Sequence, residues 1–265
     1  MEYYFIGIIS LALLGIFTGI MSGLMGIGGG LIIIPALTVI LKIFNVPSHY
    51  IMHVAVGTSL CVMICTSLSN VISHNKHNNI VWPIFKTALP GIITGTVLGA
   101  VSSKFIDGNS LSIIFGIFLL IVSIKTYFGF KPKHKKQYTT KRKWFKTVGG
   151  LIGFKSGLLG VGGGALSVPF LFFCGLDARK VVGTTASFTL PIAIIGSALS
   201  LISLDSSVHI PYSTGYIFWP GFIVLSICTV VFVHVGAKLV TILPGELVRK
   251  LFAVILLVLS LKMFF

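Results

Sequence analysis

The chain has 265 residues, of which 55% are hydrophobic and 9% are charged, and its mean hydropathy is +1.04. A soluble domain carries about a quarter charged residues, so this composition excludes one and indicates an integral membrane protein. The formal net charge of +15 does not indicate nucleic-acid binding, because nine of the 20 Lys and Arg residues lie between Lys125 and Lys146 with no acidic residue among them. A basic run of this kind marks a cytoplasmic loop of a membrane protein.

Apolar segments recur along the whole chain and lack the strict alternation of a membrane β-barrel, so they predict helices. Residues 5 to 42 as one helix would be about 57 Å long, far more than the ~30 Å of a hydrocarbon core, so we expect a break. The short second helix of each half is expected to enter the membrane only part way. In chain order the predicted helices are 5–25, 31–43, 51–73, 81–101, 111–129, 146–161, 165–175, 181–203, 217–237 and 248–265.

The second half of the chain repeats the first. The stretch SGLMGIGGGLIIIP at Ser22–Pro35 returns as SGLLGVGGGALSVP at Ser156–Pro169, at an offset of 134 residues. Two shorter motifs also return, GTS as GTT at an offset of 126 and WP at an offset of 137. These motifs begin at Gly57 and Gly183, and at Trp82 and Trp219. The sequence therefore predicts a tandem duplication, with a first transmembrane repeat at 1–130, a basic linker at 131–145 and a second repeat at 146–265.

Charge placement predicts the orientation of the repeats, because Lys and Arg in short loops prefer the cytoplasm. If the basic linker is cytoplasmic, counting five segments per half places most of the other loop cations on the cytoplasmic side as well. Counting four segments per half would reverse the ratio of cytoplasmic to external cations. An odd number inverts the second copy, as in many secondary transporters. The cations predicted inside are Lys76, Lys86, Arg179, Lys180, Lys238, Arg249 and Lys250, and those predicted outside are Lys42, Lys104 and Lys262. We therefore expect an all-α integral membrane protein with about 8–10 transmembrane or half-membrane helices in two inverted repeats.

Each repeat carries a glycine cluster followed by a proline, and together they predict a helix break. Glycine permits positive φ, and Pro35 and Pro169 lack an N–H and tend to kink a continuing helix. The free N–H groups at the start of the next helix carry the positive end of the helix dipole and can hold an anion. Close helix packing through small residues is the alternative interpretation. The predicted anion-binding glycines are Gly28, Gly29 and Gly30 in the first repeat and Gly162, Gly163 and Gly164 in the second.

Side chains near the glycine clusters add candidate ligands. Lys155 lies within a predicted helix, where a cation either meets an anion or water, or caps a helix and reaches toward the interface. Thr58 and Ser59, with Thr184 and Thr185, follow the start of the third helix of each repeat. Their hydroxyl groups can donate to a substrate oxygen or cap a helix. We therefore include all five residues in the predicted substrate site.

Other chemistry is not supported by the sequence. His74 and His77 lie in a short polar segment without clustered carboxylates, so no metal site is expected. His234 is the histidine placed deep enough in a predicted helix to titrate during transport, and a plain packed histidine is the alternative. No paired acids, His–carboxylate pair or interfacial reactive thiol indicates an enzyme, and no cofactor or nucleotide-hydrolysing motif is found. A coupling ion or a partner ATPase would therefore drive any uphill transport.

The doubled GxxGxGGGxxxxP signature at Gly23–Pro35 and Gly157–Pro169, with GTS or GTT after each copy and a basic central linker, resembles the sulfite exporter TauE/SafE family. The resemblance covers nearly the whole chain. It implies a multi-pass transporter of small, often sulfur-containing anions in the cytoplasmic membrane, with an anionic substrate and the lipid bilayer as its partners. With the inverted repeats, it predicts a secondary transporter that works by alternating access, and an anion channel is the alternative.

Overall fold

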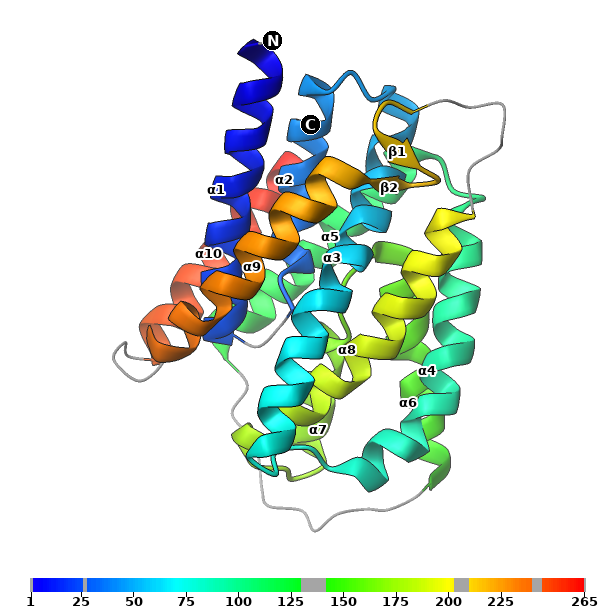
Figure 1. The fold of residues 1–265 in the computed structure, drawn as a ribbon. Helices are drawn as coiled ribbons and strands as arrows, with labels where there is room; N and C mark the ends of the chain where they lie inside the picture. The colour runs from blue at the N-terminus through cyan, green and yellow to red at the C-terminus, as the bar shows by residue number, and fades with distance from the viewer. Residues whose placement is uncertain (1, 26–27, 130–141, 203–209, 240–244, 265) are drawn as a thin grey trace.

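The computed structural model describes residues 2–25, 28–129, 142–202, 210–239 and 245–264, and their fold is almost entirely helical (Figure 1). The all-α membrane fold predicted from the composition is thereby confirmed. The helices are α1 (Glu2–Met25), α2 (Gly30–Ile43), α3 (Ser48–Lys76), α4 (Trp82–Ser103), α5 (Gly108–Phe128), α6 (Arg142–Leu159), α7 (Gly164–Phe173), α8 (Ala178–Leu201), α9 (Trp219–Leu239) and α10 (Gly245–Lys262). A small hairpin, β1 (Ser213–Thr214) and β2 (Ile217–Phe218), precedes α9.

Six of the described helices are long and apolar enough to cross a membrane, namely α1, α3, α4, α5, α8 and α9. The second helix of each repeat is shorter, with 14 residues in α2 and 10 residues in α7. At 1.5 Å per residue these helices are about 21 Å and 15 Å long, less than the ~30 Å hydrocarbon core. They are therefore shorter than a straight helix that spans the core, and partial entry into the membrane stays a prediction.

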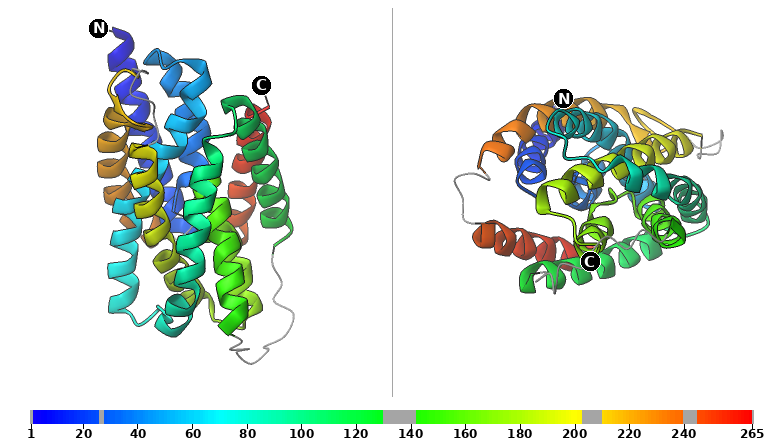
Figure 2. Two further views of the ribbon diagram at one scale, coloured as in Figure 1. Left: turned by 90° about the vertical axis from the view of Figure 1, so that its right-hand side faces the viewer. Right: turned by 90° about the horizontal axis from the view of Figure 1, so that it is seen from below.

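The helices run between two ends of the molecule. We call the end at which α3 ends and α4 and α6 begin the linker end, which is the bottom of Figure 1. Both chain termini lie toward the opposite end (Figure 2). The predicted linker, 131–145, lies outside the described residues except for its last four positions, which already belong to α6 because this helix begins at Arg142.

The two sequence repeats interlock. The first helix of each repeat packs along the fourth helix of the other, so α1 lies against α9 and α6 lies against α4 (Figure 2). The α4–α6 contact is made by backbone, since a Cβ atom built on Gly95 would overlap the carbonyl oxygen of Gly150, and one built on Gly153 would overlap that of Ile92. A Cβ atom built on Gly157, the first glycine of the second signature copy, would likewise overlap the carbonyl oxygen of Thr96. This glycine therefore serves close helix packing, the alternative that the sequence leaves open.

At the centre, α3 packs against α8, and each of these helices also packs on the fourth helix of the other repeat. They are the most buried of the long helices. Residues on α3 and α8 therefore line the inside of the bundle, where a transport site has to lie.

Candidate functional site

Both glycine clusters interrupt the chain between two helices. Helix α1 ends at Met25 and α2 begins at Gly30, with Gly28 and Gly29 at φ values of 81° and 76°. The second break lies between α6 and α7, where Gly160 has a φ of 66°. This left-handed region favours glycine, because a Cβ atom would meet the backbone there. The predicted breaks thus fall on the glycines.

The prolines do not break the helices, and the assignment of Pro35 and Pro169 as helix-break positions is corrected. Each proline lies inside a short helix, five residues after its first residue. Proline nitrogen carries no hydrogen, so the carbonyl groups of Leu31 and Ala165 lack their intrahelical donor, but the helix continues. The interruption depends on glycine alone, since glycine supplies the unusual backbone angles.

The two breaks meet inside the bundle. A Cβ atom built on Gly30 would lie 3.2 Å from the carbonyl oxygen of Gly160 and 3.2 Å from Oγ of Ser59. Gly28 faces Thr189 of α8, and Gly160 packs against Val56 of α3. The start of α2 and the end of α6 therefore share one region between α3 and α8.

Helix α7 begins on the other side of the second break. Gly163 is its N-cap, and the carbonyl oxygen of Gly163 accepts hydrogen bonds from the backbone N–H of Ser167 and from its hydroxyl group, at 3.0 and 2.9 Å. Gly162, Gly163 and Gly164 are all buried. The first N–H groups of such a helix have no intrahelical acceptor, which suits them to an anion.

Two of the predicted threonines, Thr58 and Thr184, hold corresponding turns. Oγ1 of Thr58 accepts a hydrogen bond from the backbone N–H of Phe218, at 2.9 Å, and Oγ1 of Thr184 accepts one from Val81, at 3.0 Å. Phe218 and Val81 directly precede α9 and α4. Each threonine therefore caps a helix of the other repeat, and its role toward a substrate stays a prediction.

The residues that follow the threonines differ in their hydrogen bonding. Oγ of Ser59 is buried and has no hydrogen-bond partner among the described residues. Oγ1 of Thr185 accepts a hydrogen bond from Ser167 at 3.1 Å. A buried hydroxyl group without a partner is costly, so Ser59 is the stronger candidate for a group that completes its bonding with a ligand.

Lys155 lies beside the second break. Its Nζ donates a long hydrogen bond of 3.4 Å to the carbonyl oxygen of Gly162 and stands 4.7 Å from the centroid of the Phe118 ring. The side chain is only partly buried. A hydrogen bond of this length is weak, so the ammonium group keeps most of its capacity to bind an anion.

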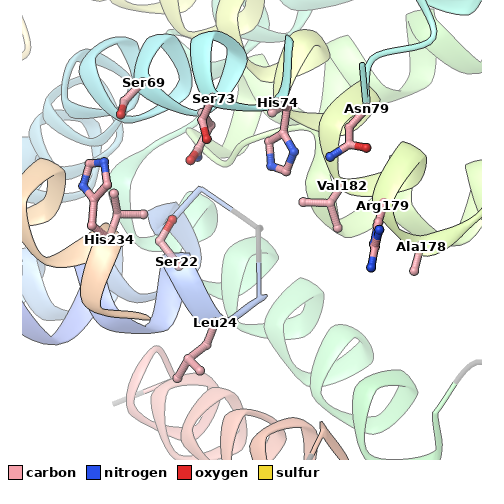
Figure 3. A pocket seen from close by; sticks show the side chains of 14 residues that line it. Ser22, Leu24, Ser69, Ser73, His74, Asn79, Ala178, Arg179, Val182 and His234 are labelled. Atoms are coloured by element: carbon pink, nitrogen blue, oxygen red, sulfur yellow. The ribbon is translucent and has the colours of Figure 1, made fainter. Parts of the chain in front are cut away.

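A pocket of about 370 Å³ opens near the linker end, and Figure 3 shows its lining. It is formed by the end of α1, the second half of α3, the first half of α8 and the end of α9. In Figure 3 the rings of His74 and His234 point into the space between these helices. The lining residues are Ser22, Gly23, Leu24, Ser69, Asn70, Ser73, His74, Asn79, Ala178, Arg179, Val182, Ala186, Val233 and His234.

The pocket is suited to an anion. Arg179 carries a permanent positive charge. None of the residues that line the pocket is acidic. Nδ1 of His234 donates to the carbonyl oxygen of Val230 at 3.0 Å, which leaves Nε2 as an acceptor for a hydroxyl group or water. Asn70, Asn79 and several serines add neutral donors. Guanidinium, amide and hydroxyl groups together can surround a small oxyanion.

The pocket also reaches the first break. Ser22, Gly23 and Leu24 are among the last residues of α1 before the chain turns. Oγ of Ser22 is buried and, within the described parts of the chain, has no hydrogen-bond partner. The pocket therefore extends to the end of α1, next to the first break, and the Ser22 hydroxyl group in its lining is unpaired among the described residues.

Comparison with known proteins agrees with this architecture. The sequence profile of the family described as sulfite exporter TauE/SafE matches residues 11–263. The chain belongs to the sulfite exporter TauE/SafE family. A probable membrane transporter protein of Haemophilus influenzae is 31% identical over 256 residues, covering 95% of this chain and 96% of that protein. One from Methanocaldococcus jannaschii is 29% identical over 241 residues, 90% of this chain and 89% of the relative. No solved structure matches the chain.

Family membership makes this chain a membrane transporter, as the sequence predicts. For a TauE/SafE transporter the pocket is the natural place to look for substrate contacts. From the sequence, Arg179 indicates only the orientation of its helix, and His74 lies in a short polar segment, so neither residue is predicted to belong to a site. A basic residue at the start of a helix is a weak signal alone, and only the packing of α8 against α3 brings Arg179 near His74.

Proposed function

We propose that this protein is a secondary transporter that carries a small anion, sulfur-containing or a carboxylate, across the cytoplasmic membrane by alternating access. The main observation that supports this proposal is the basic pocket of about 370 Å³ that extends from the linker end toward the first glycine break. Its size suits a small oxyanion, and Arg179 can bind two oxygens of one anion through its planar guanidinium group. The pocket then serves as the access route in the conformation seen here.

The glycine region is the proposed site of tightest substrate contact. It combines the N-terminus of α2, the nearby end of α6 and the unpaired hydroxyl group of Ser59. Interrupted helices that present their N-termini to an anion are a recurrent device of secondary transporters. Lys155 belongs to the proposed site as the charge beside the second break.

Two observations support an inverted relation between the repeats, on which alternating access depends. Helix α3 runs toward the bottom of Figure 1, whereas its counterpart α8 runs toward the top. Contacts are also mirrored, since Thr58 caps α9 as Thr184 caps α4. Rocking of one repeat against the other would therefore expose the same region from either side.

The linker end is proposed to face the cytoplasm. The seven cations that the five-segment count predicts inside lie toward this end, and the three others lie toward the opposite end. An excess of Lys and Arg in cytoplasmic loops is the strongest orientation signal in membrane proteins. The pocket would then open inward.

Counterflow in proteoliposomes tests the proposal. Vesicles loaded with unlabelled sulfite, sulfonate or carboxylate should accumulate the labelled anion in exchange, as expected for a carrier. Replacing Arg179→Gln should weaken apparent affinity by roughly tenfold to hundredfold, because a charge-assisted hydrogen bond is lost. Lys180→Gln is the matched control, since Lys180 is the next residue on α8 and does not line the pocket.

Three outcomes would contradict parts of this proposal. Large voltage-dependent currents without exchange would make the protein a channel. No exchange with any of these anions would reject the substrate class. Equal effects of the Arg179 and Lys180 substitutions would remove the pocket from the transport route.

A further inference from the structure

The inward pocket has a matching set of positions in the other repeat. The duplication pairs residues of α8 with residues of α3 at an offset of 126, and residues around the start of α4 with those around the start of α9 at an offset of 137. The matching pairs are Arg179 with His53, Val182 with Val56, Ala186 with Leu60, and Asn79 with Tyr216.

Contacts show that these positions also match in space. The backbone N–H of Asn79 donates to the carbonyl oxygen of His74 at 3.0 Å, and that of Tyr216 donates to Ser200 at 2.9 Å, where Ser200 is the counterpart of His74. A Cβ atom built on Gly183 would meet the Asn79 carbonyl, as one on its counterpart Gly57 would meet that of Tyr216. The region around His53 and Tyr216 is thus the counterpart of the pocket at the opposite end.

This counterpart region is filled, whereas the pocket is open. His53 is 7% exposed, although its counterpart Arg179 is exposed. The His53 ring lies 5.3 Å from the Tyr216 ring, centroid to centroid, with an interplanar angle of 34°. Nε2 of His53 donates to the carbonyl oxygens of Ser103 and Ile106, both at 3.1 Å. These contacts join α3, the end of α4 and the hairpin before α9.

Below His53 the same face of α3 is sealed by apolar side chains. Val56 is 4% exposed and packs on Gly160, at the second break. One turn further, Leu60 packs on Gly196 of α8. In the open pocket the counterpart of Leu60 is the smaller Ala186, and that of Gly196 is the polar Asn70. Side chains therefore fill on one side the volume that is open on the other.

His53 is incompletely bonded in this packed state. Because carbonyl oxygens only accept hydrogen bonds, Nε2 carries the ring hydrogen that binds them. Nδ1 is buried and has no partner among the described residues. An unpaired buried nitrogen is costly, and exposure to water or to a polar substrate would satisfy it.

Building on the proposed alternating-access function, we infer that the substrate route to the opposite side runs between α3, α8 and the start of α9, and that His53 and Tyr216 close it in this conformation. Opening would separate the His53 ring from the hairpin and expose Val56 in part, as Val182 is partly exposed in the pocket. In the opposite conformation His53 would then line an open pocket, as Arg179 does here. Asn79 would lie in the packed region, as Tyr216 does here.

Thiol labelling tests this inference. In a variant lacking Cys61, Cys65, Cys174 and Cys228, a single cysteine is placed at Val56→Cys, or at Val182→Cys as the matched control. A membrane-impermeant maleimide is then applied from either side of oriented vesicles. We expect Val182→Cys to react from the linker side and Val56→Cys to react only from the opposite side, and slowly.

Adding His53→Ala or Tyr216→Ala should raise the rate at Val56→Cys by about tenfold, because loss of the ring contact shifts the population toward the open state. Tyr212→Ala, an exposed tyrosine on the same hairpin, should leave the rate unchanged. Retained labelling of Val182→Cys from the linker side shows that each gate variant is folded. If His53→Ala does not fold, the result with Tyr216→Ala decides whether the gate exists.

Labelling of Val56→Cys from the linker side, or an unchanged rate in both gate variants, would overturn the inference. Counterflow is measured on the same preparations. Faster labelling without anion exchange would support the gate but reject the proposed substrate class. Failure of the gate inference can therefore be distinguished from failure of the proposed function.

Discussion

Thr58 and Thr184 illustrate how single residues hold this bundle together. Each is buried in a central helix, and each accepts a backbone N–H from the segment that leads into a helix of the other repeat. A backbone N–H buried without an acceptor costs about 1–3 kcal/mol. These threonines therefore stabilise the turns at both ends of the molecule, whatever contact they make with a substrate.

We predict that Thr58→Val or Thr184→Val lowers stability by about 1–3 kcal/mol, because valine keeps the shape of threonine but removes the acceptor. Thermal unfolding of the purified protein in detergent measures the effect. Thr94→Val is the control, since the exposed Thr94 hydroxyl bonds only within its own helix. Equal losses at Thr58 and Thr94 would contradict the capping role.

Lys155 permits a second prediction at this scale. Replacing Lys155→Ala should weaken anion affinity by about tenfold or more while expression is retained, because the charge beside the second break is lost. Phe118→Leu is the control, since it removes the ring contact but keeps the charge. Ligand-induced thermal shift measures affinity and stability together. Unchanged uptake kinetics would remove Lys155 from the site and leave it a structural cap.

At the scale of helices, glycine serves two separate purposes in one signature. Its first glycine in the second copy, Gly157, brings helix backbones into contact at Thr96, and later glycines supply the turns at the breaks. The short α2 and α7 begin at these turns inside the bundle and run toward its two opposite ends. The backbones of α4 and α6 pack closely, and this packed pair of helices holds the second break in position.

We predict that Gly95→Ala lowers stability by about 1–3 kcal/mol, because the new methyl group would overlap the Gly150 carbonyl and push α4 away from α6. The same thermal unfolding assay applies. Thr94→Ala, on the exposed side of α4, should have little effect. A tolerated alanine at position 95 would show that the two helices separate readily.

Across the whole molecule, two matching halves adopt different states. The side of the bundle near Arg179 is open, while the matching side near His53 is packed. Charge is divided as well, with most loop cations toward the linker end. Both asymmetries concern the same axis, from the linker end to the opposite end.

Orientation is testable with single cysteines in the cysteine-free variant. Phe105→Cys, at a position 84% exposed between α4 and α5, should react with an impermeant maleimide on intact cells. His77→Cys, at the exposed end of α3, should react only after lysis, because the positive-inside rule places that end in the cytoplasm. The reverse result would invert the proposed topology.

The helices, their breaks and the membrane environment could be predicted from the amino-acid sequence without the structure. These follow from local chemistry: apolar length, backbone freedom at glycine and the placement of Lys and Arg. Proline was misleading at residues 35 and 169, since a helix tolerates its missing donor when surrounding packing holds the chain.

Only the tertiary structure decided which side chains meet. Arg179, His74 and His234 come from three helices and share a pocket because the repeats interlock, and Thr58 bonds a residue 160 positions away. The open and packed sides carry different residues at matching sequence positions, but those differences do not say by themselves which side is open. The difference lies in how helices of the two repeats press together, which depends on contacts between distant parts of the chain.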